Sequence, residues 1–215
     1  MQPSASLERA GTLATMNGQL PSDVEILLER PGPGPHRTTI VIGGMAIETL
    51  ADLPPARDGL LFVGLNPSPV SVAAGHYFQG QLGHLFWRRL MAAAILPTDT
   101  DIAAADDALL AAGHGVTDLH KVPTPRDEAT HATLRQGVGP LWQKVAIWRP
   151  AAVVFVYKRA AEVVAARPLA EPWGQLTGVA LSGRPCFLMP GPYAPAEEVV
   201  AGLNYLRNLG ASLPR

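Results

Sequence analysis

Two proline-rich loops hold the residues of this chain whose types and spacing could support chemistry. The first, at 66–69, reads Asn-Pro-Ser-Pro and offers the side-chain amide of Asn66. The second, at 189–193, reads Met-Pro-Gly-Pro-Tyr and offers the aromatic ring of Tyr193. Proline restricts the backbone of both, as suits loops that must hold one shape. Neither loop contains a charged residue, which favours a site that binds and positions its ligand by fixed dipoles. The alternative interpretation is that both loops are ordinary rigid turns.

Each loop directly follows a stretch that is predicted to be a buried strand. A continuous apolar run predicts a buried strand at 60–65, a second buried strand is predicted at 151–156, and further strands are predicted at 115–119 and 185–189. Helices are predicted at 85–96, at 101–112, at 130–148 with a fresh start at Pro140, from Lys158 onward, and at 197–206. This alternation predicts an α/β fold: a three-layer sandwich with a central, mainly parallel sheet of four or five strands and helices on both faces. Ligands of such sheets bind beyond the carboxyl ends of the strands, where both loops lie.

The N-terminal part of the chain has weaker patterns. Residues 1–20 show no convincing periodicity, and Pro-Gly-Pro-Gly-Pro at 31–35 is typical of a turn or linker. A short strand is predicted at 38–42, followed by one or two helical turns within 46–53 that the next prolines stop. We therefore expect residues 1–37 to be a tail and linker and residues 38–215 to form one domain.

Composition limits the class of protein. The 215 residues are 47% hydrophobic and 16% charged, which fits one globular domain with a sizeable core. The net charge of -1 excludes a broad basic coat, so any contact with DNA must come from a local patch. Cys186 is the only cysteine, which excludes an intrachain disulfide and a four-cysteine zinc or iron–sulfur site. The sequence shows no signal-peptide pattern or membrane-length apolar run, so we expect a soluble, cytoplasmic protein.

A set of short motifs follows the chain in a fixed order. They are Gly-Leu-Asn-Pro at 64–67, Gly-His-Tyr-Phe at 75–78, Phe-Trp at 86–87, Gly-Val-Thr-Asp-Leu at 115–119 with Pro-Thr at 123–124, Arg-Pro at 149–150, Trp-Gly at 173–174 and Met-Pro at 189–190. In this order, from roughly residue 60 to the C-terminus, they resemble the mismatch-specific uracil and thymine-DNA glycosylases of the uracil-DNA glycosylase superfamily. Each motif alone is weak, whereas the ordered set is specific.

The resemblance implies a DNA repair enzyme. It would flip uracil, or another mismatched or damaged pyrimidine, out of DNA and hydrolyse the N-glycosidic bond, leaving an abasic site. Because the leaving base is an anion, such a site needs a shaped pocket, a positioned water and fixed dipoles more than acid–base groups. Neither loop holds a lysine for a Schiff base, so strand cleavage is not expected. We expect a nucleoid-associated monomer that needs no metal or cofactor and has no obligate protein partner.

The resemblance also implies roles for individual residues near the base. Asn66 would hold the attacking water, and Phe78 would stack on the flipped base. Backbone N–H groups of Leu65 and Phe78 would face the uracil carbonyls. Other substrate-binding positions would be Gly64, Ser71, and His84, which stands where the family has asparagine. An Asx-turn for Asn66 and a core position for Phe78 are the structural alternatives.

Other residues are implied to contact DNA. Phosphates would be met by Lys121 and Arg126, and further candidates are Arg88 and Arg89. The last loop would enter the duplex; it consists of Met189, Pro190, Gly191, Pro192 and Tyr193. Tyr193 would fill the gap that the flipped base leaves, unless it packs on the domain surface and caps the following helix with its hydroxyl.

The chain departs from the family pattern at two loops. Ser68 stands where the family has a second glycine, and the last loop of the family reads like Asn-Pro-Ser-Gly or Met-Pro-Ser-Ser. A protein that binds uracil or abasic sites in DNA with little turnover is therefore the alternative. The superfamily members that use an aspartate and a histidine do not fit, since the loops hold Asn66 and no histidine. The chain also lacks nucleotide-binding Gly-x-Gly-x-x-Gly and Gly-Lys-Ser/Thr motifs, and its scattered histidines form no metal-hydrolase pair at i, i+4.

Overall fold

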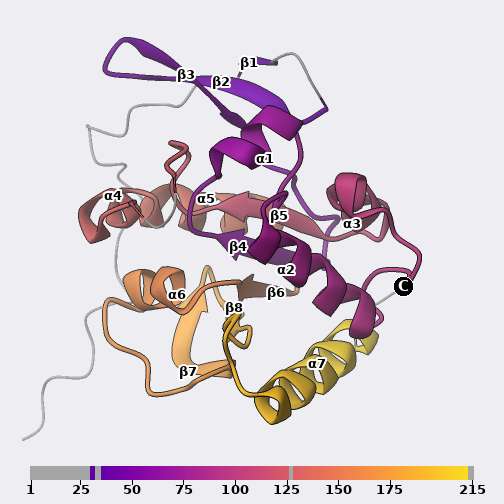
Figure 1. Cartoon of the computed structure of the whole chain (residues 1–215). Coiled ribbons are helices and arrows are strands. Elements are labelled where there is room, and N and C mark those ends of the chain that lie inside the picture. Colours follow the sequence, from indigo (N-terminus) through magenta and orange to yellow (C-terminus); the bar gives the residue numbers. More distant parts are fainter. Residues whose placement is uncertain (1–29, 32–34, 126–127, 213–215) are drawn as a thin grey trace, which may run out of the picture.

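The computed structural model describes residues 30–31, 35–125 and 128–212, which form a large sheet between helices and a small sheet beside it (Figure 1). The large sheet has five strands in the order β5-β4-β6-β8-β7. Four of them are parallel: β4 (Leu60–Gly64), β5 (Gly115–Asp118), β6 (Ala152–Phe155) and β8 (Arg184–Leu188). The edge strand β7 (Gly174–Leu181) pairs with β8 antiparallel. The predicted α/β sandwich with a mainly parallel sheet is confirmed.

Alternate residues of the buried strands face opposite helical layers, as the period of two in a strand requires. Leu60 and Phe62 belong to the core cluster that also contains residues of four helices: α1 (Pro69–Ala74), α2 (Gln81–Ala92), α3 (Ala105–Ala111) and α7 (Ala196–Ala211). Leu61 and Val63 belong to the other cluster, with α4 (His131–Gln136), α5 (Val138–Trp148) and α6 (Lys158–Ala165). The continuous apolar run of β4 is thus explained by burial on both faces.

The helices agree with the sequence patterns except near their ends. The stretch predicted at 130–148 is two helices, because the chain turns at Gly137 between α4 and α5. A Cβ there would lie 1.6 Å from the carbonyl oxygen of Leu119, so this close approach requires glycine. Pro140 lies in the first turn of α5, where its missing N–H costs nothing. A 3-10 helix, η1 (Ile102–Ala104), opens the segment predicted at 101–112, and the short α1 (Pro69–Ala74) was not predicted.

The N-terminal hairpin contradicts one prediction. The helical turns predicted within 46–53 are wrong, because β3 (Met45–Leu50) pairs along its whole length with β2 (Arg37–Ile42). Gly43 and Gly44 have φ values of 57° and 79°, the left-handed conformation that a two-residue hairpin turn needs. β1 (Arg30–Pro31) adds a third strand within the range predicted to be a tail. Leu50 is fully buried in the core, so the hairpin is docked on the main sandwich.

Two further features complete the fold. The edge strand β7 was not predicted, because its alternation of buried and exposed residues stops after Thr177, where Gly178 has a φ of 73° and the pairing with β8 shifts register. In the part of the chain that the structure describes, no helix combines the length and apolarity needed to cross a bilayer.

Candidate active site

A cavity of about 290 Å³ opens where the parallel strands end. Its walls come from the segment after β4, the end of β5, the loop that follows it, and the segment after β6. Four of the residues that the resemblance implies for the substrate line it together: Leu65, Asn66, Ser71 and Phe78. The volume lies near the lower end of the roughly 300–1,000 Å³ typical of small-molecule sites, which suits a single base.

The side chain of Asn66 has a defined orientation. Its amide nitrogen donates to Thr124 Oγ1 at 2.8 Å and to the carbonyl oxygens of Pro67 at 3.2 Å and Val122 at 3.5 Å. Because carbonyl oxygens can only accept, the NH₂ group must face them. The amide oxygen of Asn66 is therefore the atom left to accept a hydrogen bond from a molecule in the cavity.

The turn after Asn66 is built by serines. The Ser68 side chain accepts from the backbone N–H of Ser71 and caps the N-terminus of α1. Ser68 has a φ of -83°, so a glycine is not required at this position. Ser71 Oγ lies 2.9 Å from Ser68 Oγ and accepts from the backbone N–H of Gln79 at 3.1 Å. Ser71 is thus a buried connection between the two segments that form the cavity wall.

Phe78 is held against the cavity by close packing. Its φ of 55° lies in the left-handed region, which a residue with a side chain adopts only when its surroundings enforce it. The ring packs 4.5 Å from the ring of Phe86, centre to centre. A Cβ at Gly64 would lie 3.3 Å from the Phe78 ring, and a Cβ at Gly83 would lie 2.1 Å from the Phe78 carbonyl oxygen. Glycine at both positions therefore lets Phe78 reach the cavity.

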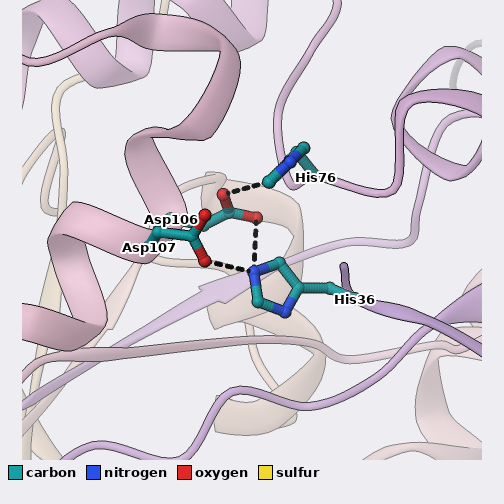
Figure 2. A group of neighbouring side chains, drawn as sticks. All are labelled: His36, His76, Asp106 and Asp107. Atoms are coloured by element: carbon teal, nitrogen blue, oxygen red, sulfur yellow. Dashed lines mark hydrogen bonds and ion pairs between the residues drawn. The ribbon is translucent and has the colours of Figure 1, made fainter. Parts of the chain in front are cut away.

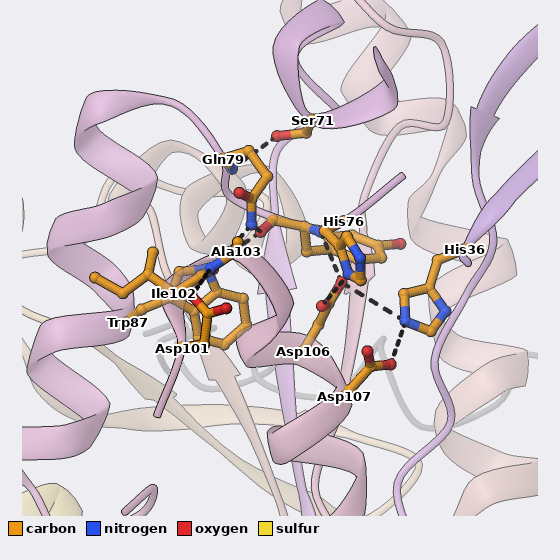
Figure 3. Close-up of polar contacts among 11 residues, drawn as sticks. His36, Ser71, His76, Gln79, Trp87, Asp101, Ile102, Ala103, Asp106 and Asp107 are labelled. Atoms are coloured by element: carbon orange, nitrogen blue, oxygen red, sulfur yellow. Dashed lines mark hydrogen bonds and ion pairs between the residues drawn. The ribbon is translucent and has the colours of Figure 1, made fainter. Parts of the chain in front are cut away.

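The polar contacts beyond Phe78 fix the same segment. His76 Nδ1 lies 2.7 Å from Asp106 Oδ1 (Figure 2), and the other Asp106 oxygen accepts from the backbone N–H of Tyr77 at 2.8 Å. Gln79 extends this network, because its side chain donates to the carbonyl oxygens of Tyr77 and Ile102 while its N–H reaches Ser71 (Figure 3). Residues 76–79 are thus anchored on both sides of Phe78.

Asp118 is a cavity residue that the sequence did not single out as functional. It ends β5, lines the cavity and is buried. Burial raises the pKa of Asp118 to about 7; Lys121 and Lys144 act against this shift and Asp52 adds to it. Its Oδ2 atom has no hydrogen-bond partner among the described residues. A carboxylate at the end of a buried parallel strand is the signal that could have identified it.

Lys121 does not have the position expected of a phosphate contact. It is 5% exposed, and its ammonium group lies 3.0 Å from Asp52 Oδ1 and 3.2 Å from the Tyr77 hydroxyl. Burial opposes the ionisation of Asp52, but Lys121 and Lys144 outweigh it and lower the Asp52 pKa. Lys121 therefore pairs with the carboxylate of Asp52 and does not have the solvent-facing position that a phosphate contact requires.

The last loop is anchored where it leaves β8 and is exposed at its tip. The Arg89 guanidinium donates to the carbonyl oxygens of Pro190 at 2.8 Å and Gly191 at 3.2 Å, so Arg89 supports the loop and is buried. A Cβ at Gly202 of α7 would lie 2.2 Å from the Pro190 ring. Tyr193 is 87% exposed, and among the described residues no side chain caps the N-terminus of α7, so the packed-down alternative for Tyr193 does not fit.

The loop lies beside the cavity. A small hollow bounded by Met189, Pro190 and Pro192 shares two of its lining residues, Leu82 and Tyr157, with the main cavity.

Of the other expected residues, His84 is half-buried on α2 and does not line the cavity, and Arg88 is exposed on the same helix. The expected phosphate contact of Arg126 lies outside the described residues.

The sequence of this chain matches a known protein family. The model of the uracil DNA glycosylase superfamily matches residues 51–203, which is more than half of the chain. A search of curated proteins gives no match. The matched range contains both proline-rich loops, all five strands of the large sheet and every cavity-lining residue except Leu50. The chain therefore belongs to the uracil DNA glycosylase superfamily.

Proposed function

We propose that this chain is a monofunctional uracil-DNA glycosylase, which receives uracil in the cavity after base flipping and hydrolyses its N-glycosidic bond. The observation that carries the proposal is the orientation of Asn66: three acceptors hold its NH₂ group, so its oxygen is offered to the cavity that Phe78 lines. A base stacked on an aromatic ring gains about 1–3 kcal/mol. A neutral amide beside an aromatic surface suits a reaction whose leaving group is a base anion.

The proposed reaction needs positioning more than proton transfer. The oxygen of a water bonds to C1′ of the sugar while the bond from C1′ to the base nitrogen breaks, and its electron pair leaves with uracil. Asn66 accepts a hydrogen bond from this water and orients it, but cannot remove its proton. The developing charge on the base is stabilised by backbone N–H groups of Leu65 and Phe78. As the C1′–O bond forms, the water loses one proton to solvent, and the departing uracil anion takes up a proton from solvent, so the products are free uracil and an abasic site.

The finer specificity is part of the same proposal. The motif order favours the mismatch-specific type, in which the loop at 189–193 enters the duplex and senses the opposite base. The contacts of Arg89 with Pro190 and Gly191 and the exposure of Tyr193 support this role, because a rigid loop loses little entropy when it inserts into the duplex. We further propose that the protein acts as a monomer on the nucleoid.

A strand-nicking assay on duplexes with a single uracil tests the proposal. The wild-type chain should release free uracil and leave a strand that breaks only after alkali or heat. We expect U:G to be processed faster than U:A, with T:G and single-stranded uracil defining the range of substrates. Specific binding without release of uracil would instead support a uracil- or abasic-site-binding protein. Strand breaks that form without alkali would contradict a monofunctional enzyme.

A further inference from the structure

Four side chains with metal-binding atoms converge (Figure 2), and none of them lines the cavity. His36 precedes β2, His76 follows α1, and Asp106 and Asp107 lie in the first turn of α3. One ligand atom from each residue lies within 4.8 Å of the ligand atoms of the other three. The cluster has no signature in the sequence, because three distant segments supply it.

The two imidazoles each turn one nitrogen toward the carboxylates. His36 Nε2 lies 2.8 Å from Asp107 Oδ1 and 3.9 Å from Asp106 Oδ2. His76 Nδ1 lies 2.7 Å from Asp106 Oδ1. Adjacent residues of a helix usually diverge, yet Asp106 and Asp107 both reach His36. The ligand atoms therefore already surround one small volume.

Among the described residues, the two carboxylates of the cluster have only histidines as ion-pair partners. The side chain of Asp106 is 0% exposed, and its ion pairs within the described ranges are with His36 and His76. Burial of a carboxylate is costly unless a cation accompanies it, and Asp107 adds a second carboxylate. A divalent cation would balance both.

We propose that His36, His76, Asp106 and Asp107 form a structural binding site for a zinc-type divalent cation. Two imidazole nitrogens and two carboxylate oxygens make up the four-ligand set that Zn²⁺ accepts, whereas Mg²⁺ prefers oxygen ligands in an octahedron. The Asp107 side chain is 53% exposed, so the ion can enter from solvent. The Tyr77 N–H donates to Asp106 at 2.8 Å, the kind of outer contact that orients a metal ligand.

The site would join the N-terminal hairpin to the wall of the cavity. His36 belongs to the segment that leads into β2, and its N–H donates to the carbonyl oxygen of Gly75 at 3.1 Å. His76 and Tyr77 precede Phe78, whose left-handed conformation the surrounding contacts must maintain. None of the four ligands lines the cavity, so the ion would stabilise this segment without touching the base.

Titration of the full chain with Zn²⁺, after treatment with a chelator, tests the site. Calorimetry should show one ion bound per chain, and thermal unfolding should show a Tm that rises by several degrees with Zn²⁺ and does not change with Mg²⁺. His36→Gln and Asp107→Asn should each weaken Zn²⁺ binding by about 10²-fold or more. His131→Gln, which changes an exposed histidine of α4, is the matched control and should bind like the wild type.

Co²⁺ provides a second measurement on the unaltered protein. The visible absorption of a tetrahedral Co²⁺ site should appear with the wild-type chain and disappear when Zn²⁺ is added. The proposal is overturned if the wild-type chain binds neither ion, or if both ligand variants bind Zn²⁺ as tightly as His131→Gln does. Because binding and unfolding are measured, neither result depends on whether the chain excises uracil.

Discussion

The cavity combines one fixed amide with one carboxyl group whose charge depends on pH. Asn66 is neutral at every accessible pH, and its hydrogen bonds hold it in one orientation. Asp118, the only carboxyl among the described lining residues, has a pKa raised to about 7 by burial. Below that pH its carboxyl can donate a hydrogen bond, and above it both oxygens can only accept. Asp118 is therefore the group expected to set the pH dependence of the reaction.

We expect the single-turnover rate of uracil excision to fall as the pH rises through about 7. Uracil presents carbonyl acceptors and leaves as an anion, so a protonated Asp118 assists where an ionised one repels. Asp118→Asn has nearly the same shape and keeps a donor at every pH, so its rate should be flat across this range. The measurement is the rate at pH values from 5.5 to 8.5 for both proteins. Parallel profiles would show that Asp118 does not face the base.

Local motifs predict the site residues that lie within them. They miss contacts that depend on how distant segments of the chain pack together. The ordered motifs predict that Asn66 and Phe78 belong to one site, and the structure brings both to one cavity. The contact from Asn66 to Thr124 and the burial of Asp118 depend on how β4 and β5 pair, which local patterns do not contain. Lys121 has the composition of a surface residue, and only packing shows its ion pair with Asp52.

The last loop is the element whose local structure bears most directly on DNA. It is anchored through Arg89 on α2 and Pro190 against α7, while Tyr193 extends into solvent. Exposure of a large aromatic ring on a rigid loop is costly to the free protein, and contact with unstacked bases would remove it from water. The arrangement supports Tyr193 as the residue that occupies the gap after base flipping.

Tyr193→Ala is expected to reduce excision from duplex DNA about 10-fold more than excision from single strands. Unstacking costs a few kcal/mol in a duplex, and only there does a vacated stack need filling. The measurement is the single-turnover rate on both substrates. Trp142→Ala is the matched control, because Trp142 is 50% exposed on α5. An equal loss on both substrates would assign Tyr193 to pocket shape or folding instead.

A helix or strand can be predicted when its own sequence carries the signal, and it is missed when its formation depends on a distant partner. The strands β4 and β6 were predicted because continuous apolar runs record burial on both faces, whereas β5 and β8, which were also predicted, contain polar or charged residues. The β3 sequence, Met-Ala-Ile-Glu-Thr-Leu, contains good helix formers, and pairing with β2 overrides that preference. An edge strand such as β7 has one covered face, so its signal is weaker.

The whole molecule brings the two proline-rich loops to one edge of a single sheet. β4 and β8 both neighbour β6 and run parallel to it, so the loops that follow them lie at the same end. Helices on both faces bury the strands and hold this edge rigid (Figure 1). The fold thereby places Asn66 and the loop that contains Tyr193 on the same side of the molecule, as a protein that flips a base and fills the gap requires.

The most direct test compares uracil release by the wild-type chain, Asn66→Ala and Thr124→Val on a U:G duplex under single-turnover conditions. Asn66→Ala should lose on the order of 10²-fold or more in rate, the effect of removing a preorganised polar group. Thr124→Val removes one hydrogen bond that orients Asn66 and should lose about 10-fold. DNA affinity and Tm should change little, and Thr133→Val on α4 serves as the control. A near-normal rate for a folded Asn66→Ala would contradict the proposed reaction.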